Sequence, residues 1–503
     1  MKIQIDRSDK TPLYKQIAGQ IQAQITSGEI PEGFQFPSER QLADALDVNR
    51  TTVLNAYKEL KADGLIASHV GSGTVAVRNQ NSEPVILSHR KDPMWEHLFS
   101  DHMKNQDSFD INKYLEVANQ RDVISFAAGI ASFELPPVQA FAGIEKELLG
   151  SGKGLLVSPV AGFSSLRRVM SSYMQKRSCF CQPSEIMITS GAQQGIDLIA
   201  RAFINPGDIV LIEEPSFFPA IRSFRSMGAK LMAVPMEKDG MDVDILEQLL
   251  TRYRPKLIYT MPAYHNPCGV TMSIPKRVRL LELAGRYGIP VLEDDPYSEL
   301  NYEGPPVTPL KSMDKSGYVI YLSTFSKTIY PGLRLGWICA DKKLISRLSG
   351  IRQLMDLHSG CISQQIAERF IVSGELKKYL TLIRREYRER RDIMTDALIR
   401  YAPAGLTWNR PEGGYYLWCR LPEGLSSDIL VTRAAERGVA ILPGTPSYLT
   451  PYKGECYIRL NYTFPPRDRI AEGIRILCEV IEELASARPE YTLCPDSEIN
   501  PIL

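Results

Sequence analysis

The sequence predicts an α/β protein in which a small N-terminal helical domain precedes a much larger unit of alternating strands and helices. Residues 1–77 read as three helices followed by two short strands. Further along, apolar runs such as 209–212 and 289–292 are each followed by a polar turn, which is typical of buried strands in an α/β sheet. At 503 residues the chain is long enough for about three domains. We therefore expect one small domain and a larger unit built from two lobes.

The first 77 residues have the pattern of a winged helix-turn-helix. A first helix is indicated over 13–26 by apolar residues at every fourth position, namely Leu13, Ile17, Ile21 and Ile25. A second helix begins near Ser38, and a third runs from Arg50 to about Asp63. Two short strands then flank a Gly-Ser-Gly tip at 71–73. In this arrangement the N-terminal residues of the third helix enter the DNA major groove.

This stretch resembles the DNA-binding domain of the GntR family of bacterial regulators. The matching motifs are Pro-Ser-Glu-Arg at 37–40, Asn-Arg-Thr-Thr-Val at 49–53, Ala-Tyr-Lys-Glu-Leu at 56–60 and Asp-Gly-Leu-Ile at 63–66. The resemblance implies binding to double-stranded operator DNA. The residues that would contact DNA are Arg40, Arg50, Thr51, Thr52 and, in the wing, Gly71 and Gly73.

Charge by itself favours another interpretation, a small helical interaction domain. Residues 1–77 hold eight Lys and Arg against nine Asp and Glu, so no basic excess indicates a nucleic acid. The placement of the charges favours DNA instead. Arg40 and Arg50 fall on helix faces that we expect to be exposed, whereas acids such as Glu29 and Glu32 fall in turns.

One lysine in the larger unit has the neighbours that an aldehyde cofactor needs. Lys327 follows a hydroxyl-rich turn with Ser323, Thr324 and Ser326, and Arg334 comes just past a Pro-Gly turn. A lysine forms a Schiff base with an aldehyde, while hydroxyls and a guanidinium suit a phosphate. A cofactor that carries both an aldehyde and a phosphate is pyridoxal 5′-phosphate (PLP).

Four upstream segments supply the remaining groups, each directly after a strand-like apolar run. Asp294 can pair with the pyridinium nitrogen and keep the ring an electron sink. Tyr297 and Asn266 can donate hydrogen bonds to the phenolic oxygen of the ring. The turn 189–195 opens a helix whose N–H groups and dipole suit a phosphate, and Phe217 can stack on the pyridine. Each segment alone reads as an ordinary turn, cap or core residue; their joint occurrence in this order indicates a PLP site.

Residues 122–485 resemble a fold-type I PLP-dependent aminotransferase with large and small subdomains, closest to the aminoadipate and kynurenine aminotransferases. The resemblance implies that Lys327 forms the internal aldimine and that Arg459, in the segment 457–462, grips a carboxylate of the substrate or effector with its bidentate fork. The cofactor-binding residues that it implies are Ala192, Gln193, Phe217, Asn266, Asp294, Tyr297, Thr324, Ser326, Lys327 and Arg334.

One position departs from the pattern of these enzymes. They usually carry a tyrosine five positions before the glycine of a Pro-Ala-Gly turn, and its hydroxyl reaches the phosphate in the neighbouring subunit. Here the turn reads Val-Ala-Gly at 160–162, and Val157 stands at the tyrosine's position. The missing hydroxyl weakens the expectation of efficient transamination.

A GntR-type domain joined to an aminotransferase-like domain resembles the MocR family of bacterial regulators. We expect domains at 1–77 and 122–485, a linker at 78–121 and a tail at 486–503. The resemblance implies a homodimeric regulator that senses an amine or amino-acid effector, or PLP itself, through the aldimine at Lys327. The alternative is an aminotransferase with a vestigial N-terminal domain, and a third interpretation is that one chain has both activities.

Composition indicates a cellular location. The formal net charge is +1, so no strong field favours a membrane surface. The first residues do not read as a signal peptide, and no apolar run approaches about 18 residues. Nine scattered cysteines, with no Cys-x-x-Cys pair, favour reduced thiols over a disulfide framework or a zinc site. We therefore expect a cytoplasmic protein without a metal site or a membrane anchor.

Overall fold

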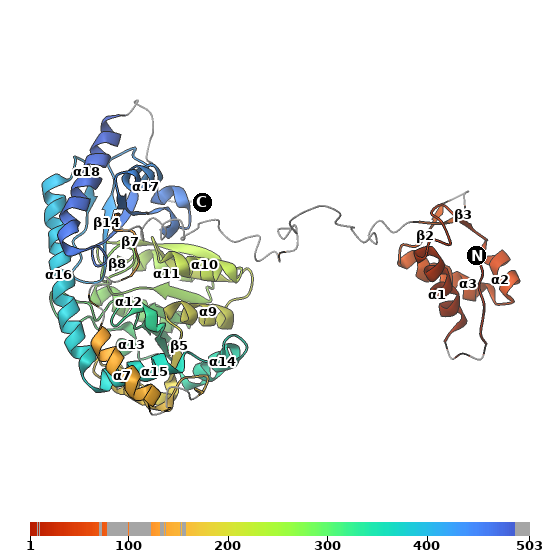
Figure 1. Ribbon diagram of the computed structural model, residues 1–503, viewed down its shortest axis with the longest axis horizontal. Helices are drawn as coiled ribbons and strands as arrows, with labels where there is room; N and C mark the ends of the chain where they lie inside the picture. The colour runs from red at the N-terminus through yellow and green to blue at the C-terminus, as the bar shows by residue number, and fades with distance from the viewer. Residues whose placement is uncertain are drawn as a thin grey trace. The chain divides into compact units, whose positions relative to one another are not determined.

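The protein consists of two compact units, Met1–Leu98 and Phe99–Leu503 (Figure 1). Each unit has a hydrophobic core of its own. The computed structural model describes residues 1–7, 9, 11–69, 73–77, 99, 122–130, 135, 137–150, 152 and 157–487. Almost all of the expected linker 78–121 and of the expected tail 486–503 therefore lies outside the described residues, as does the wing glycine Gly71.

The N-terminal unit is a winged helix-turn-helix. Its elements are α1 (Leu13–Thr26), β1 (Gln35–Phe36), α2 (Glu39–Leu46), α3 (Arg50–Ala62), β2 (Ile66–His69) and β3 (Gly73–Ala76). The strands form an antiparallel sheet in the order β1-β3-β2. The three helices and the hairpin agree with the sequence prediction, whereas β1 was not expected. The side chains of Ile17, Val53, Tyr57 and Leu60 are buried where the helices meet.

Two side-chain caps fix where the helices α2 and α3 begin. The Ser38 hydroxyl accepts a hydrogen bond from the Gln41 amide while the Gln41 side chain accepts one from the Ser38 amide, which is a capping box. Asn49 caps α3, because its Oδ1 accepts a hydrogen bond of 3.0 Å from the Thr51 amide. Between the helices, Asp47 has a left-handed backbone with φ of 49°. The first turn of α3 is thereby held at a defined angle to α2.

A large mixed sheet forms the centre of the second unit. Its strand order is β5-β12-β11-β10-β9-β6-β7-β8. The bounds are β5 (Ile186–Thr189), β12 (Gly336–Cys339), β11 (Val319–Thr324), β10 (Val291–Asp294), β9 (Leu257–Thr260), β6 (Ile209–Glu214), β7 (Lys230–Glu237) and β8 (Gly240–Met241). Neighbouring strands are parallel except at β12 and β8.

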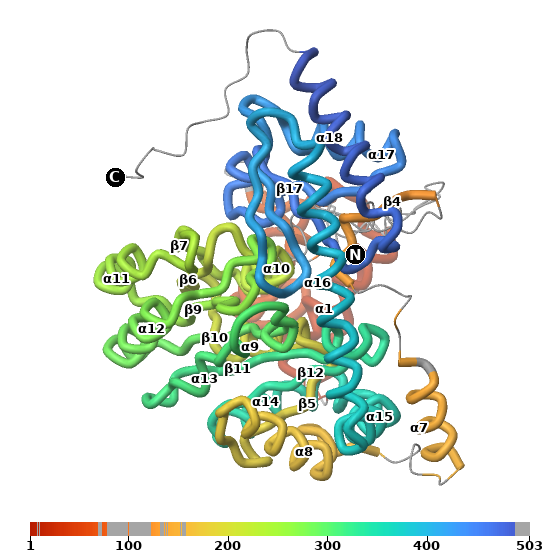
Figure 2. The backbone as a smooth tube through the Cα atoms, turned by 90° about the vertical axis from the view of Figure 1, so that its left-hand side faces the viewer, coloured from red at the N-terminus to blue at the C-terminus, as the bar shows by residue number. Residues whose placement is uncertain are grey.

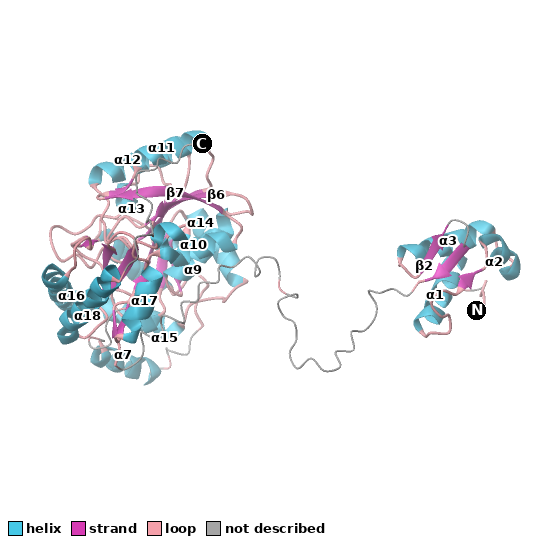
Figure 3. Cartoon of the chain, turned by 90° about the horizontal axis from the view of Figure 1, so that it is seen from above, coloured by secondary structure: helices cyan, strands magenta, loops and turns pink. Residues whose placement is uncertain are grey.

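Helices flank this sheet (Figure 3). They are α7 (Val138–Gly150), α8 (Ser164–Gln175), α9 (Ala192–Phe203), α10 (Phe218–Ser226), α11 (Val243–Arg252), α12 (Ile274–Tyr287), α13 (Leu310–Met313), α14 (Lys342–Gln353) and α15 (Cys361–Val372). Every residue of β5, β9, β10 and β11 is buried, as expected for strands covered on both faces. The polar ends of these strands are therefore where functional groups can gather.

A smaller lobe completes the second unit. Its antiparallel sheet has the order β13-β14-β17-β16, and a parallel pair joins β4 to β15. The elements are β4 (Ile124–Ser125), β13 (Thr407–Trp408), β14 (Tyr416–Arg420), α17 (Ser427–Glu436), β15 (Val439–Ala440), β16 (Leu442–Pro443), β17 (Tyr457–Asn461) and α18 (Ile470–Ser486). Helix α16 (Glu375–Tyr401) leads into this lobe and lies beside α18 (Figures 1 and 2).

The structure also bears on the expectations about reduced thiols and about membrane-spanning helices. Among the described residues seven cysteines are free thiols, as predicted, but Cys456 is disulfide-bonded, so the prediction of reduced thiols is wrong at that position. Within the described ranges, no helix combines the length and the apolar character needed to cross a membrane.

Candidate cofactor site and DNA-binding surface

The candidate cofactor residues meet at one edge of the large sheet. Parallel pairing aligns β9, β10 and β11, so that Glu293 lies opposite Thr260 and Asp294 opposite Leu322. The chain leaves each of these strands at the same edge. Parallel alignment therefore explains why Asp294, the segment with Asn266 and the turn with Lys327 come together.

Asp294 has the environment that a pyridinium nitrogen needs. Its side chain is 1% exposed, and its Oδ2 accepts a hydrogen bond of 2.7 Å from the Tyr259 hydroxyl. Its Oδ1 is buried and has no hydrogen-bond partner among the described residues. Burial raises the pKa of the Asp294 carboxyl to about 7, although the Tyr259 hydrogen bond and the Lys327 charge oppose the rise. A ring N–H would satisfy the unpartnered oxygen, so the carboxyl fits the role that PLP requires.

Lys327 lies in the turn after β11, close to aromatic rings. Its Nζ donates to the Gly129 carbonyl and lies 5.5 Å from the centre of the Tyr415 ring. The Tyr415 hydroxyl donates a hydrogen bond of 3.0 Å to the Lys327 carbonyl, which fixes the backbone of the turn. Burial lowers the pKa of the Lys327 ammonium, and the positive charges of Arg459 and Arg334 lower it further. A lysine that loses its proton more easily is a better nucleophile toward an aldehyde.

The start of α9 and Arg334 form a cradle of phosphate-binding character. Gly191, which has φ of 94°, directly precedes Ala192 at the helix N-terminus. A side chain at Gly191 would place its Cβ 3.0 Å from Nη2 of Arg334, and it would have to adopt a φ that is strained for residues other than glycine. Thr324 Oγ1 donates to the Leu335 carbonyl at 2.9 Å on the same side. Free helix N–H groups beside a guanidinium suit a phosphate.

The remaining implied cofactor residues lie near this cradle. The Ser326 amide donates a hydrogen bond of 3.1 Å to Thr324 Oγ1. Gln193, in the first turn of α9, donates from Nε2 to the Ser223 hydroxyl at 2.7 Å. Phe217 is partly buried just before α10 and packs against the main core. The roles of these residues toward PLP remain predictions.

Arg459 is buried in a polar and aromatic setting. Its guanidinium lies 4.2 Å from the centre of the Tyr416 ring, and its Nη1 donates to Asn266 Oδ1 at 3.1 Å. Its Nη2 donates to the Ala127 carbonyl at 2.8 Å. The side chain of Arg459 is only 4% exposed, and its Nε has no hydrogen-bond partner among the described residues. A carboxylate that accepts from this guanidinium would supply the missing contact.

Three tyrosines that sequence reasoning missed connect these groups. Tyr259 donates to Asp294, Tyr415 supports Lys327, and Tyr416 lies under Arg459 while accepting a hydrogen bond of 3.2 Å from Tyr297. Tyr259 had a detectable signal, since it is a polar-tipped residue inside the apolar run 257–260. Tyr415 and Tyr416 had none, because only the pairing of β14 with β17 brings them to the site.

The candidate DNA-binding residues lie on the surface of the N-terminal unit. Arg40, Arg50 and Thr51 are exposed at the starts of α2 and α3, and Thr52 is partly exposed. The Arg50 guanidinium forms an ion pair of 3.3 Å with Glu39, with 70% of the arginine side chain exposed. Gly73, at the start of β3, is exposed with φ of 81°. Apart from Gly71, which lies outside the described residues, these residues are at least partly exposed, and their contact with DNA remains a prediction.

Comparisons with known proteins assign each unit to a family. Residues 121–477 match the family model "Aminotransferase class I and II", and residues 13–75 match "Bacterial regulatory proteins, gntR family". The solved kynurenine aminotransferase of Pyrococcus horikoshii, crystallised with PMP, is similar in fold, with a TM-score of 0.75 and 37% identity. That similarity covers 79% of this chain and 99% of the enzyme.

Two relatives match different extents of the chain. The aromatic-amino-acid aminotransferase 1 of Thermococcus litoralis is 38% identical over 397 residues, which is 77% of this chain and 95% of the enzyme. The HTH-type transcriptional regulator YdfD of Bacillus subtilis, itself uncharacterized, is 32% identical over 481 residues. That second match covers 95% of this chain and 98% of the relative, so it spans both units.

Proposed function

The chain belongs to the class I and II aminotransferase family and also carries a gntR-family DNA-binding domain. We propose its function from this combination, which is the architecture of MocR-type regulators. It is a PLP-dependent, DNA-binding transcriptional regulator. Its aminotransferase-like unit senses a small molecule, and its winged helix binds an operator. The observation that carries the cofactor-binding part of this proposal is the buried, half-satisfied carboxyl of Asp294, together with a buried lysine of lowered pKa. The gntR-family domain on the same chain favours sensing as its use.

Each group around the cofactor has a distinct task. PLP supplies, when bound, an aldehyde that condenses with amines and a ring that withdraws electrons. Lys327 would hold the aldehyde carbon, and Asp294 would keep the ring nitrogen protonated through Oδ1. Tyr297 and Asn266 hold the phenolic oxygen. The phosphate is held by the start of α9 with Ala192 and Gln193, by the hydroxyls of Thr324 and Ser326, and by Arg334, while Phe217 stacks on the ring.

The effector is an amine, and most favourably an amino acid. Its amino group would take the place of Lys327 Nζ, and its carboxylate would accept hydrogen bonds from Arg459. Arg459 now donates to Asn266 and to the Ala127 carbonyl, so binding a carboxylate rearranges contacts on both lobes. Such a rearrangement couples effector binding to the state of the whole unit. In a variant of this proposal, PLP itself is the effector, and the forms with and without cofactor differ in DNA affinity.

A homodimer completes the proposal. The apolar side chains of Leu354 and Leu357 are 90% and 54% exposed, and that of Val157 is 81% exposed. Asp356, in the loop with the two leucines, accepts a hydrogen bond of 2.6 Å from Gln194 in α9, so Leu354 and Leu357 lie near the phosphate cradle. We infer that a second copy of the chain covers them, as in fold-type I relatives whose sites lie at a subunit interface. A dimer places two winged helices on one cytoplasmic operator.

The deciding experiment titrates the PLP-loaded protein with a panel of amino acids and other amines. Absorbance of the cofactor and affinity for a DNA site selected from random sequence are recorded together. We expect one amine to shift the absorbance and to change DNA affinity by about 5- to 150-fold, the usual range of allosteric coupling. The matched variant Arg459→Ala should lose this response for carboxylated amines and keep it for amines without a carboxylate.

A turnover assay on the same PLP-loaded protein tests the alternative function. Sustained conversion of amino acids to 2-oxo acids at enzyme-like rates, with DNA affinity indifferent to every amine, would show an aminotransferase with a vestigial N-terminal domain. The exposed Val157, in place of a phosphate-binding tyrosine, favours regulation over efficient turnover. Val157→Tyr therefore tests this point directly, because it should tighten PLP binding if the second copy supplies this position.

A further inference from the structure

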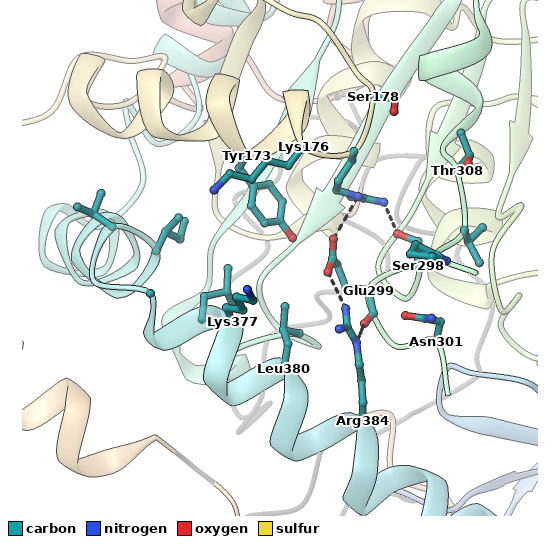
Figure 4. Close-up of a pocket in the computed structure, with 17 residues that line it drawn as sticks. Tyr173, Lys176, Ser178, Ser298, Glu299, Asn301, Thr308, Lys377, Leu380 and Arg384 are labelled. Carbon is teal, nitrogen blue, oxygen red and sulfur yellow. Dashed lines mark hydrogen bonds and ion pairs between the residues drawn. The ribbon is translucent and has the colours of Figure 1, made fainter. Parts of the chain in front are cut away.

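A second cavity lies away from the cofactor site in the same unit. It has a volume of about 540 Å³, within the range of about 300–1,000 Å³ that holds small molecules. Its walls come from the end of α8, from the loop 298–308 after β10, and from the junction of α15 and α16 (Figure 4). None of the residues proposed to bind PLP or the effector lines it.

The lining of this cavity carries an excess of positive charge. Its four cationic residues are Lys176, Arg177, Lys377 and Arg384, and its one acidic residue is Glu299. Glu299 is already engaged, because its carboxylate pairs with Arg177 at 3.3 Å and with Arg384 at 2.9 Å (Figure 4). The carboxylate therefore leaves no counter-charge for the two lysines.

Lys176 and Lys377 stand on opposite walls, at the end of α8 and in the first turn of α16 (Figure 4). Within the described part of the chain, neither ammonium group has an ion pair or a hydrogen bond. Two unpaired cations on the rim of a concave site favour an anion, because opposite charges near partly desolvated walls attract more strongly than in bulk water.

The rest of the lining is largely apolar. Val307, Leu376 and Leu380 face the cavity together with the ring of Tyr173, whose hydroxyl points toward Glu299 (Figure 4). Leu376 and Leu380 lie one turn apart on α16 and form a continuous apolar strip. Apolar walls below a cationic rim suit a molecule with an anionic head and an apolar body.

We propose that this cavity is a second small-molecule site that binds an amphipathic carboxylate. The carboxylate lies between Lys176 and Lys377, and the apolar body lies against Val307, Leu376 and Leu380. This proposal does not depend on the function of the PLP site. It assigns to the aminotransferase-like unit a ligand that has no need of an amino group.

The test uses the PLP-loaded protein and 4-phenylbutyrate as the probe, followed by isothermal titration calorimetry. We expect the double variant Lys176→Glu/Lys377→Glu to weaken binding by about tenfold or more, since it removes the charged partners of the carboxylate. Lys378→Glu is the matched control, because Lys378 lies on the same helix but outside the lining. Its exposed ion pair with Glu375 contributes little, so binding should change by less than about twofold.

Two further variants separate this cavity from the cofactor site. Val307→Trp fills the cavity and should abolish probe binding while the absorbance of bound PLP stays unchanged. Arg459→Ala should leave probe binding intact. The neutral analogue 4-phenylbutan-1-ol should bind at least about tenfold more weakly than the carboxylate.

Four results would overturn the proposal. They are absence of probe binding up to about 10 mM, unchanged binding in the double lysine variant, equal binding of the alcohol, and loss of binding in Arg459→Ala. The last result would place the probe at the PLP site instead.

Discussion

The DNA-binding surface and the cofactor site are prepared for their ligands in opposite ways. Arg50 keeps 70% of its side chain in water, where its polar groups are hydrated before DNA arrives. Asp294 and Arg459 are almost fully buried, and each has a polar atom without a partner among the described residues. A buried unsatisfied group costs folding free energy, whereas a hydrated one does not. The buried groups therefore lower the folding stability of the free protein until a ligand satisfies them, whereas the exposed Arg50 can be substituted with little effect on folding stability.

The largest expected effect concerns the buried lysine. Lys327→Ala should remove the absorption band of the Schiff base between the lysine and PLP, because the covalent link to the aldehyde is lost. The protein should stay folded, since Nζ contacts only the Gly129 carbonyl and the Tyr415 ring among the interactions that the structure describes. Lys311→Ala is the control, as Lys311 is another partly buried lysine of the same unit. An unchanged absorption band in Lys327→Ala would identify a different lysine as the covalent one.

Asp294→Asn tests the electrostatic cost of the buried site. The folded pKa of Asp294 is about 7, above its ordinary value of about 3.9, so the folded protein binds this proton more tightly than the unfolded chain. The free energy of unfolding of the cofactor-free protein therefore falls as pH rises from about 4 to about 7, and asparagine removes this loss. We expect cofactor-free Asp294→Asn to exceed the wild type by about 2–4 kcal/mol at pH 8 and to converge with it near pH 4. Urea unfolding at several pH values measures the difference.

The adjacent residue Asp295 is a control for which the expected change in stability has the opposite sign. Burial opposes ionisation of Asp295, but Arg177 and Ser298 outweigh it and hold its pKa below the ordinary range. Its contribution to stability is therefore present at neutral pH and lost as the pH falls through the folded pKa. Asp295→Asn should thus be less stable than the wild type at pH 8. If both variants changed stability in the same direction at pH 8, the electrostatic account of the site would be wrong.

At the DNA-binding surface we expect a smaller change in free energy than at the buried cofactor site. Arg50→Ala should weaken specific DNA binding by about 1–3 kcal/mol if the arginine reads a base edge, with the free protein's stability nearly unchanged. Fluorescence anisotropy with the selected operator and with unrelated DNA measures the specific and the non-specific affinity. Lys61→Ala, at the other end of α3, removes the same charge and should not alter the preference for the operator. Normal operator binding by Arg50→Ala would remove this residue from the recognition surface.

The smallest effect concerns the cap that positions α2. Ser38→Ala removes the capping box with Gln41 and should lower the stability of the N-terminal unit by about 1 kcal/mol. The absorbance of PLP and the unfolding of the second unit should not change, because each unit has its own core. Thermal unfolding followed by circular dichroism and by cofactor absorbance separates the two units. A shift in the cofactor signal would mean that the units do not unfold independently.

The sequence predicts the groups that end strands and begin helices, because those positions depend on local pattern. Asp294 ends β10, Ala192 begins α9, and Arg50 begins α3, each where the apolar pattern stops or starts. Local pattern cannot indicate Tyr416, which reaches Arg459 only because β14 pairs with β17. It also cannot show that Asp294 lacks a second partner, since that depends on the packing of β9 against β10.

Helix α16 connects the second cavity with the cofactor site and with the smaller lobe. Its 27 residues span about 40 Å, and a helix of that length bends only gently. Lys377 lies at one end. Further along, the Tyr387 ring meets Tyr415, which holds the Lys327 carbonyl, and Arg390 donates to the Pro465 carbonyl of the smaller lobe at 2.7 Å. The helix therefore connects its first turn to the backbone of Lys327 and to the smaller lobe through direct contacts.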